Sequence, residues 1–178
     1  DVRGRQAGAS VPVTVDGTLT AFAPSAASFS RSVLLTFSLK APAHVLLRIV
    51  SGGATVATLL DADATPGPQQ IEWDGGGLPD GSYNVVLSVT DALTTVTRSR
   101  PLRIDRVAPV LRLLSLRAVE LWVSEPARLT IVLNGRAYRL NIKRRGAFRV
   151  GHRGAVRTLR AFAVDAAGNR SRVVRATR

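Results

Sequence analysis

Basic side chains in the second half of the chain are the residues whose type and spacing suit binding chemistry. They are Arg136, Arg139, Lys143, Arg144, Arg145 and Arg149, which lie in one predicted hairpin, followed by Arg153 and Arg157 on the next predicted strands. Guanidinium groups form forked contacts with phosphate and carboxylate, and a cluster of them binds polyanions with release of counterions. The cluster predicts a site for an anionic wall polymer, such as teichoic acid, or another anionic glycan. The alternative is a solvated arginine surface that discourages pairing between sheet edges and has no ligand.

The positive charge is confined to one half. Residues 1–105 hold 8 Lys and Arg against 9 Asp and Glu, whereas residues 106–178 hold 17 against 3. Arginine supplies 23 of the 25 cations, a bias that a GC-rich genome also produces without selection for binding. Nucleic acid is the competing polyanion, but the second half has one Trp, one Tyr and two Phe and no nucleic-acid-binding motif. Nucleic acid is therefore disfavoured as a partner.

Other chemistry finds little support. The chain has no cysteine, which excludes a thiol nucleophile. Its two histidines, His44 and His152, lie far apart in the sequence, and both are expected in exposed turns. No Gly-x-Ser-x-Gly element is present. Asp61 and Asp63 would share one face of an extended segment and suit calcium, although a solvated loop before Pro66 explains them as well. We expect no catalytic residue, no metal ligand and no cofactor.

The elements that position these side chains are predicted to be strands. Apolar residues alternate with a period of two within residues 33–39, 45–49 and 83–89, and turn residues separate these stretches. In the second half, seven short strands are expected, at residues 110–116, 119–123, 127–133, 137–142, 147–150, 156–164 and 170–176. Asn134-Gly135 predicts a two-residue hairpin turn. No run approaches the roughly 18 apolar residues of a membrane span, so no membrane insertion is expected.

Proline and charge mark a boundary at residues 105–109. Proline cannot donate to a strand ladder and keeps the preceding residue extended. The 178 residues therefore divide into a flexible leader or linker at residues 1–10, a first domain at 11–105 and a basic second domain at 106–178. Both domains are predicted to be antiparallel β-sandwiches.

A short motif gives the first domain a resemblance. Its residues include Trp73, Asp74 and Gly75, followed by Gly81 and Tyr83. Trp73 supplies a large core side chain, Asp74 can bond its own turn, and the glycines permit a tight return. Residues 37–89 thereby resemble the immunoglobulin-like repeat of flagellar hook-capping proteins, which also occurs at the C-termini of secreted bacterial enzymes. Many relatives carry an acidic loop before the first strand, whereas residues 23–28 here have no acid.

The second domain has weaker family marks. It opens with Asp-x-x-Ala-Pro at residues 105–109 and ends with Asp165, Gly168 and Asn169 in Asp-x-x-Gly-Asn. These motifs, with Ser-Glu-Pro at 124–126, resemble bacterial immunoglobulin-like or fibronectin-like modules. In both families such modules are usually spacers, stalks or adhesive parts of larger extracellular proteins.

Together these features predict an all-β chain of two tandem immunoglobulin-like antiparallel β-sandwiches. The resemblances imply a non-catalytic accessory or spacer module of a larger secreted bacterial polypeptide, located outside the cell or at its surface. The alternatives are binding of an anionic wall polymer or glycan through the arginine-rich domain, and a scaffold for a flagellar or other surface filament.

Overall fold

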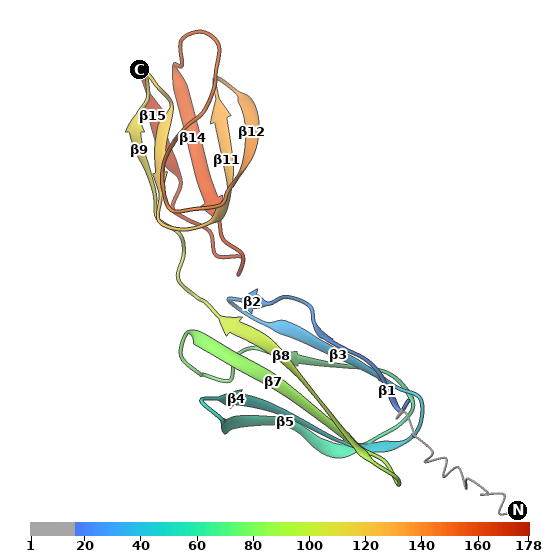
Figure 1. Cartoon of the computed structure of the whole chain (residues 1–178). Coiled ribbons are helices and arrows are strands. Elements are labelled where there is room, and N and C mark those ends of the chain that lie inside the picture. Colours follow the sequence, from blue (N-terminus) through green and yellow to red (C-terminus); the bar gives the residue numbers. More distant parts are fainter. Residues whose placement is uncertain (1–16) are drawn as a thin grey trace, which may run out of the picture.

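The computed structural model describes residues 17–178, and every regular element in that range is a strand. The expected leader at residues 1–10 and the start of the first domain at residue 11 lie outside the described residues. No helix that could cross a membrane is found between residues 17 and 178. Figure 1 shows two sandwiches placed end to end, with the C-terminus at the far end of the second one.

From residue 17 onward, eight strands build the first sandwich. They are β1 (Leu19–Pro24), β2 (Ser28–Phe29), β3 (Val33–Leu39), β4 (Ala43–Ser51), β5 (Ala54–Ala64), β6 (Gly67–Trp73), β7 (Gly81–Thr90) and β8 (Thr95–Ile104). One sheet has the order β1-β3-β6 and the other the order β2-β8-β7-β4-β5. The pairing is antiparallel except between β2 and β8, which form a short parallel pair.

Alternation along the strands produces the first core. In β3 every second residue from Val33 to Leu39 is buried, and β4 and β7 repeat the pattern. Leu47, Ile49 and Leu87 are fully buried between the two sheets. Removing each such side chain from water contributes about 1.5–3 kcal/mol, which makes this core the main stabilising element of the first sandwich.

The tryptophan and tyrosine of the sequence motif hold one end of this core. Trp73 is buried with its ring 5.6 Å from that of Phe29. Asp74 Oδ1 accepts a hydrogen bond from the backbone N–H of Gly76 at 2.9 Å. The Tyr83 hydroxyl donates to the carbonyl of Pro79 at 2.8 Å, a bond from the start of β7 back to the preceding turn that immunoglobulin-like domains commonly make. Trp73 is thus a core side chain, and Asp74 bonds its own turn.

Seven strands build the second sandwich, as expected. They are β9 (Leu111–Ser115), β10 (Glu120–Val123), β11 (Ala127–Leu133), β12 (Arg136–Ile142), β13 (Gly146–Arg149), β14 (Thr158–Val164) and β15 (Val174–Thr177). The sheets have the orders β13-β10-β9 and β12-β11-β14-β15. These orders match those of the first sandwich, with β9, β10 and β13 in place of β1, β3 and β6, and β15, β14, β11 and β12 in place of β8, β7, β4 and β5. Only β2 has no counterpart in the second sandwich, so both sandwiches share one immunoglobulin-like topology.

Asn134 and Gly135 make the predicted hairpin turn. Both have positive φ, 47° and 84°, and join β11 to β12 in full antiparallel register. The basic segment 136–149, however, does not fold as one hairpin. β12 pairs with β11, whereas β13 pairs with β10 in the opposite sheet. The turn after Ile142 therefore crosses between sheets, a long-range arrangement that local pattern does not reveal.

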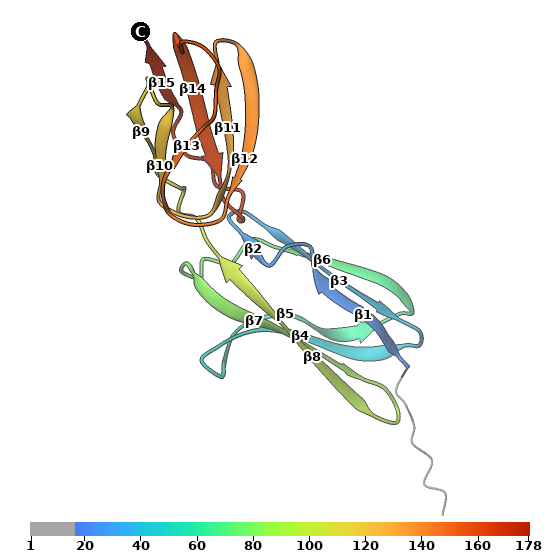
Figure 2. The same ribbon diagram turned by 45° about the horizontal axis from the view of Figure 1, so that its top comes forward.

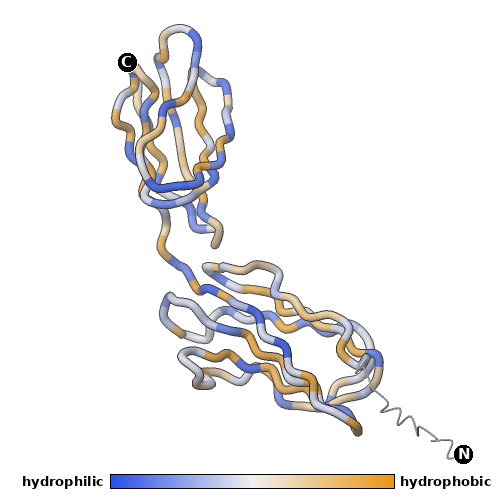
Figure 3. The backbone as a smooth tube through the Cα atoms, in the orientation of Figure 1, coloured by the Kyte–Doolittle hydropathy of each residue, from blue (hydrophilic) through white to orange (hydrophobic). Residues whose placement is uncertain are grey.

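The two sandwiches have separate cores. One buried cluster runs from Phe22 to Ile104 and the other from Leu111 to Ala163. Figure 2 shows a single extended segment leading from β8 to β9. Figure 3 shows hydrophobic and hydrophilic residues alternating along the strands of both sandwiches, while the connecting segment is mixed. The position of that segment makes it the element that sets the orientation of the two sandwiches.

Candidate functional sites at the two ends of the second sandwich

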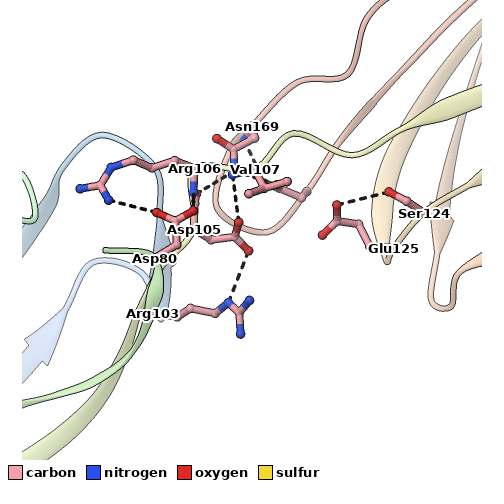
Figure 4. Close-up of polar contacts among 9 residues, drawn as sticks. Asp80, Arg103, Asp105, Arg106, Val107, Ser124, Glu125 and Asn169 are labelled. Carbon is pink, nitrogen blue, oxygen red and sulfur yellow. Dashed lines mark hydrogen bonds and ion pairs between the residues drawn. The ribbon is translucent and has the colours of Figure 1, made fainter. Parts of the chain in front are cut away.

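The linker is bound to the first sandwich through Arg106. The backbone N–H of Arg106 donates to Asp80 Oδ2 at 2.7 Å, and its Nη1 donates to Asp80 Oδ1 at 3.0 Å and to the carbonyl of Leu78 at 2.9 Å. These partners lie in the turn between β6 and β7 (Figure 4). Charged partners strengthen hydrogen bonds, so this three-bond contact fixes the start of the linker.

Asn169 holds the linker from the other side. Its Nδ2 donates to the carbonyl oxygen of Asp105 at 2.7 Å, and Figure 4 shows its side chain lying beside that of Asp105. Asp165 orients it, since its carboxylate accepts from the backbone N–H of Asn169 at 2.8 Å and from Nδ2 at 2.9 Å. Gly168, at φ 87°, permits the tight turn between Asp165 and Asn169. The Asp-x-x-Gly-Asn motif thus forms an interdomain contact.

Three carboxylates meet at this junction. Oxygens of Asp105, Glu125 and Asp165 lie within 4.8 Å of one another. Burial, and then the nearby charges of Asp165 and Asp105, raise the pKa of Glu125 above its usual value. Oxygen donors of this kind suit hard cations such as Ca²⁺, although Ca²⁺ takes six to eight ligands and these residues supply only part of that number. Sequence reasoning does not bring these three residues together, because they lie far apart in the chain.

The signal for this cluster was present in the sequence. Asp105 opens the linker motif, Glu125 belongs to the Ser-Glu-Pro motif, and Asp165 opens the closing motif. All three motifs mark turns at the same end of the sandwich. Arg103 contributes one positive charge, with its Nε 3.4 Å from Asp105 Oδ2.

The predicted arginine cluster is divided between the two ends of the second sandwich. Register places Ile142 opposite Ala127, and Gly146 opposite Val123, which in turn faces Leu111 at the start of β9. The turn with Lys143, Arg144 and Arg145 therefore lies at the linker end. Arg136, Arg153 and Arg157 belong to the opposite end of the sandwich. Arg139 is an exposed residue of β12, and Arg149 Nε lies 3.6 Å from Glu120 Oε1.

A pocket of about 470 Å³ opens at the end of the second sandwich away from the linker. Arg136 and Tyr138 line it from β12, and His152 and Arg153 line it from the segment between β13 and β14. The Arg136 guanidinium lies 5.7 Å from the centre of the Tyr138 ring. Arg136 and Arg153, 17 positions apart in the sequence, therefore line the same concave surface. We call this surface the distal pocket.

Asn134 shapes this pocket. Its Oδ1 accepts from the backbone N–H groups of Arg157 at 2.8 Å and Thr158 at 3.0 Å, and its Nδ2 donates to the carbonyl of Ala155 at 2.9 Å. Asn134 therefore both forms the predicted hairpin turn and holds the segment before β14 through hydrogen bonds.

His44 lies in a strand, which corrects the expectation of an exposed turn. It belongs to β4 and contacts β5, where its Nε2 is 2.9 Å from Asp61 Oδ1 and its Nδ1 is 3.0 Å from Asp63 Oδ1. The two aspartates share one face as expected, but they stand on a strand rather than in a loop before Pro66. Their hydrogen bonds raise the pKa of His44, that of Asp63 contributing most.

No known family profile matches the chain, and no curated protein matches it. Among solved structures, the chain is similar to the BSP domain of a biofilm-associated protein (18% identity, TM-score 0.34), covering 90% of this chain and 29% of that one. It is also similar to fibronectin(III)-like modules of Clostridium thermocellum CbhA (11%, TM-score 0.48; 88% and 90% covered) and to the D0–D1 domain of intimin (14%, TM-score 0.38; 90% and 99% covered). The chain thus spans under a third of the first of these structures. The immunoglobulin-like assignment rests on the chain's own sheets, two mainly antiparallel sandwiches whose strand orders match apart from β2.

Proposed function

We propose that the chain is a non-catalytic extracellular accessory segment whose two sandwiches, residues 11–105 and 106–178, space and orient parts of a larger secreted bacterial protein. The observation that carries this proposal is the linker, which is bonded on one side to Asp80 through Arg106 and on the other to Asn169 through Asp105. A spacer transmits position only if its joints resist bending, and the hydrogen bonds on both sides of this linker oppose such bending.

The environments of the two histidines support a non-catalytic role. His44 is bonded to carboxylates, and the Nδ1 of His152 lies 3.2 Å from the carbonyl of Val150. Within the range 17–178, neither imidazole is hydrogen-bonded to a hydroxyl group that it could activate as a nucleophile. The secreted location follows from the resemblance to modules of extracellular proteins.

The orientation of the sandwiches provides the test. Since the chain has no cysteine, Gln70→Cys on β6 and Ala137→Cys on β12 introduce two unique spin labels at exposed sites. Pulsed electron resonance then gives the distribution of distances between them. We expect one narrow distribution that broadens in the variant Arg106→Ala/Asn169→Ala. A broad distribution in the parent chain would refute the spacer proposal.

A second function is favoured by the charge of the second sandwich, which holds 17 Lys and Arg against 3 Asp and Glu. We propose that this sandwich also attaches the protein to an anionic wall polymer or glycan. The test is cosedimentation of the chain with Gram-positive cell walls, with and without teichoic acid, across a salt series. We expect polymer-dependent binding that falls steeply with salt, because counterions are released on binding. Preference for DNA or RNA over the wall polymer would contradict it.

The resemblance of residues 37–89 to hook-capping repeats supports one further role, a scaffold in a surface filament. The Trp73-Asp74-Gly75 turn and the Tyr83 bond to Pro79 are the features that carry it. Sedimentation velocity at high protein concentration distinguishes this role. Self-association would favour the scaffold role, whereas a monomer would favour the spacer role.

A further inference from the structure

We propose that the distal pocket binds a single sugar unit that bears one anionic group, an inference that rests on the proposed attachment to an anionic glycan. The pocket's volume of about 470 Å³ is within the roughly 300–1,000 Å³ typical of small-molecule sites. Its lining combines two guanidinium groups, an imidazole and a phenol ring. An anionic sugar has the matching chemistry, with a charged group, several hydroxyls and an apolar ring face.

The two arginines supply the charge recognition. Neither Arg136 nor Arg153 takes part in any of the ion pairs found between residues 17 and 178. The second half of the chain has only three acids, of which Glu120 pairs with Arg149 and the other two belong to the junction cluster at the opposite end. The positive charge at the pocket is thus uncompensated, and a guanidinium binds carboxylate or phosphate oxygens in a fork.

The floor and wall of the pocket suit a sugar ring. Leu133 and Val156 line it and are themselves buried, with 4% and 6% of their surface exposed, so they form a fixed apolar floor. Tyr138 is half-buried and packs against the same core. Sugar C–H groups can lie on such a surface while their hydroxyls reach polar atoms at the rim. His152 offers its Nε2 to a hydroxyl, because its Nδ1 contacts the carbonyl of Val150.

The pocket is also held in shape before any ligand enters. Asn134 bonds the segment at 155–158 through three hydrogen bonds, which ties the Arg153 side of the pocket to the β11–β12 hairpin that carries Arg136. A preorganised site loses less entropy on binding, which favours specific recognition over diffuse attraction.

The linker-end turn gives a matched comparison. Arg144 and Arg145 carry the same charge as Arg136 and Arg153 but lie at the other end of the sandwich, outside the distal pocket. If charge alone determined binding, the two pairs would contribute equally. If the pocket determines it, only Arg136 and Arg153 matter.

The experiment is an NMR titration of the full chain with glucose, D-glucuronate, glucose 6-phosphate and inorganic phosphate. We expect both charged sugars to shift amide signals of residues 133–138 and 151–157, and glucose and phosphate alone to bind at least tenfold more weakly. Glucuronate and glucose 6-phosphate distinguish a carboxylate ligand from a phosphate ligand. The variant Arg136→Gln/Arg153→Gln should lose binding at least tenfold, and Arg144→Gln/Arg145→Gln should change it less than twofold.

The same variants separate this inference from the function on which it rests. If the chain sediments with wall polymer but both double variants weaken that binding equally, attachment occurs through diffuse charge and the pocket inference is overturned. If the parent chain binds no polymer yet binds glucuronate in the pocket, the attachment function fails and the pocket stands. Absence of any sugar-dependent shift in the parent chain also overturns the pocket inference.

Discussion

Asn169 donates a 2.7 Å hydrogen bond from its Nδ2 to the carbonyl oxygen of Asp105, linking residues 64 positions apart across the junction of the two sandwiches. We expect Asn169→Ala to broaden the distance distribution between labels in the two sandwiches. It should also lower the free energy of unfolding of the second sandwich by about 1–3 kcal/mol, since the substitution removes both hydrogen bonds of Nδ2 and each contributes about 0.5–1.5 kcal/mol. Asn141→Ala, on exposed β12, is the control and should change neither quantity. Equal effects of the two variants would show that Asn169 does not hold the junction.

Gly75 connects the Trp-Asp-Gly motif to the linker. Its φ is +93°, and an added Cβ would lie 2.7 Å from Nη2 of Arg106. We expect Gly75→Ala to displace the Arg106 side chain from Asp80, and so to loosen the junction as well as strain the turn. The left-handed strain alone costs about 1–2 kcal/mol. Gly77→Ala is the matched control, because Gly77 has φ +74° and nothing within 4 Å of an added Cβ. Paired spin labels should show broadening in Gly75→Ala only.

Much of the fold follows from local pattern. Alternation located the strands, and Asn134-Gly135 and Asp74 to Gly77 located turns, because backbone conformation at these sites depends on the residue itself. Sheet membership depends on contacts far apart in sequence. For that reason β12 and β13 were expected to form one hairpin, whereas they belong to opposite sheets.

The sites show the same division. The sequence contains the basic cluster, but it does not separate the pocket residues Arg136 and Arg153 from Arg144 and Arg145. That separation depends on which end of the sandwich each turn occupies. The carboxylate cluster brings Asp105 to within reach of Asp165, and only the topology shows it. His44 likewise required the register of β4 with β5 before its aspartate partners could be seen.

Glu125 makes the stability of the second sandwich depend on pH. Its pKa is raised in the folded state by burial and by Asp165 and Asp105, so the folded state binds this proton more tightly than the unfolded state does. Its stabilising contribution is therefore complete below the ordinary value of 4.5 and is lost as the pH rises through the raised pKa. We expect Glu125→Gln to remove this dependence and to increase stability at neutral pH.

Urea unfolding at pH 7 and about pH 5, monitored through NMR signals of the second sandwich, measures this effect. Subtracting the unfolding free energy of Glu125→Gln from that of the parent chain removes the contributions of the other titrating groups, which both proteins share. Glu120→Gln removes one charge outside the cluster and is the control. A parent-to-variant difference that does not change with pH would contradict the account.

His44 should titrate as a residue held between two carboxylates. Its hydrogen bonds to Asp63 and Asp61 raise its pKa above 6.5. The contribution of the contact to stability is complete below the unfolded pKa and is lost as the pH rises through the raised one. We expect Asp61→Asn/Asp63→Asn to lower the pKa of His44. With two histidines in the chain, NMR follows the His44 ring separately from the other. An unchanged His44 curve would exclude the aspartates as the cause.

Asn134 combines two roles that can be separated by substitution. It adopts φ 47° in the hairpin turn and makes three hydrogen bonds to residues 155–158. Asn134→Gly keeps the conformation and removes the bonds, which should lower the free energy of unfolding of the second sandwich by about 1–3 kcal/mol. Asn134→Ala loses both and should cost about 1–2 kcal/mol more, the strain of the left-handed region.

Gly135→Ala isolates the strain, because Gly135 has φ +84° and open space around an added Cβ. Urea unfolding ranks the three variants, and titration with glucuronate then reports on the distal pocket. If the bonds of Asn134 hold the pocket in shape, Asn134→Gly weakens sugar binding whereas Gly135→Ala leaves it unchanged, even though both variants are less stable. Equal loss of binding in both variants would show that the shape of the pocket depends on the hairpin turn, and not on the hydrogen bonds that the Asn134 side chain makes.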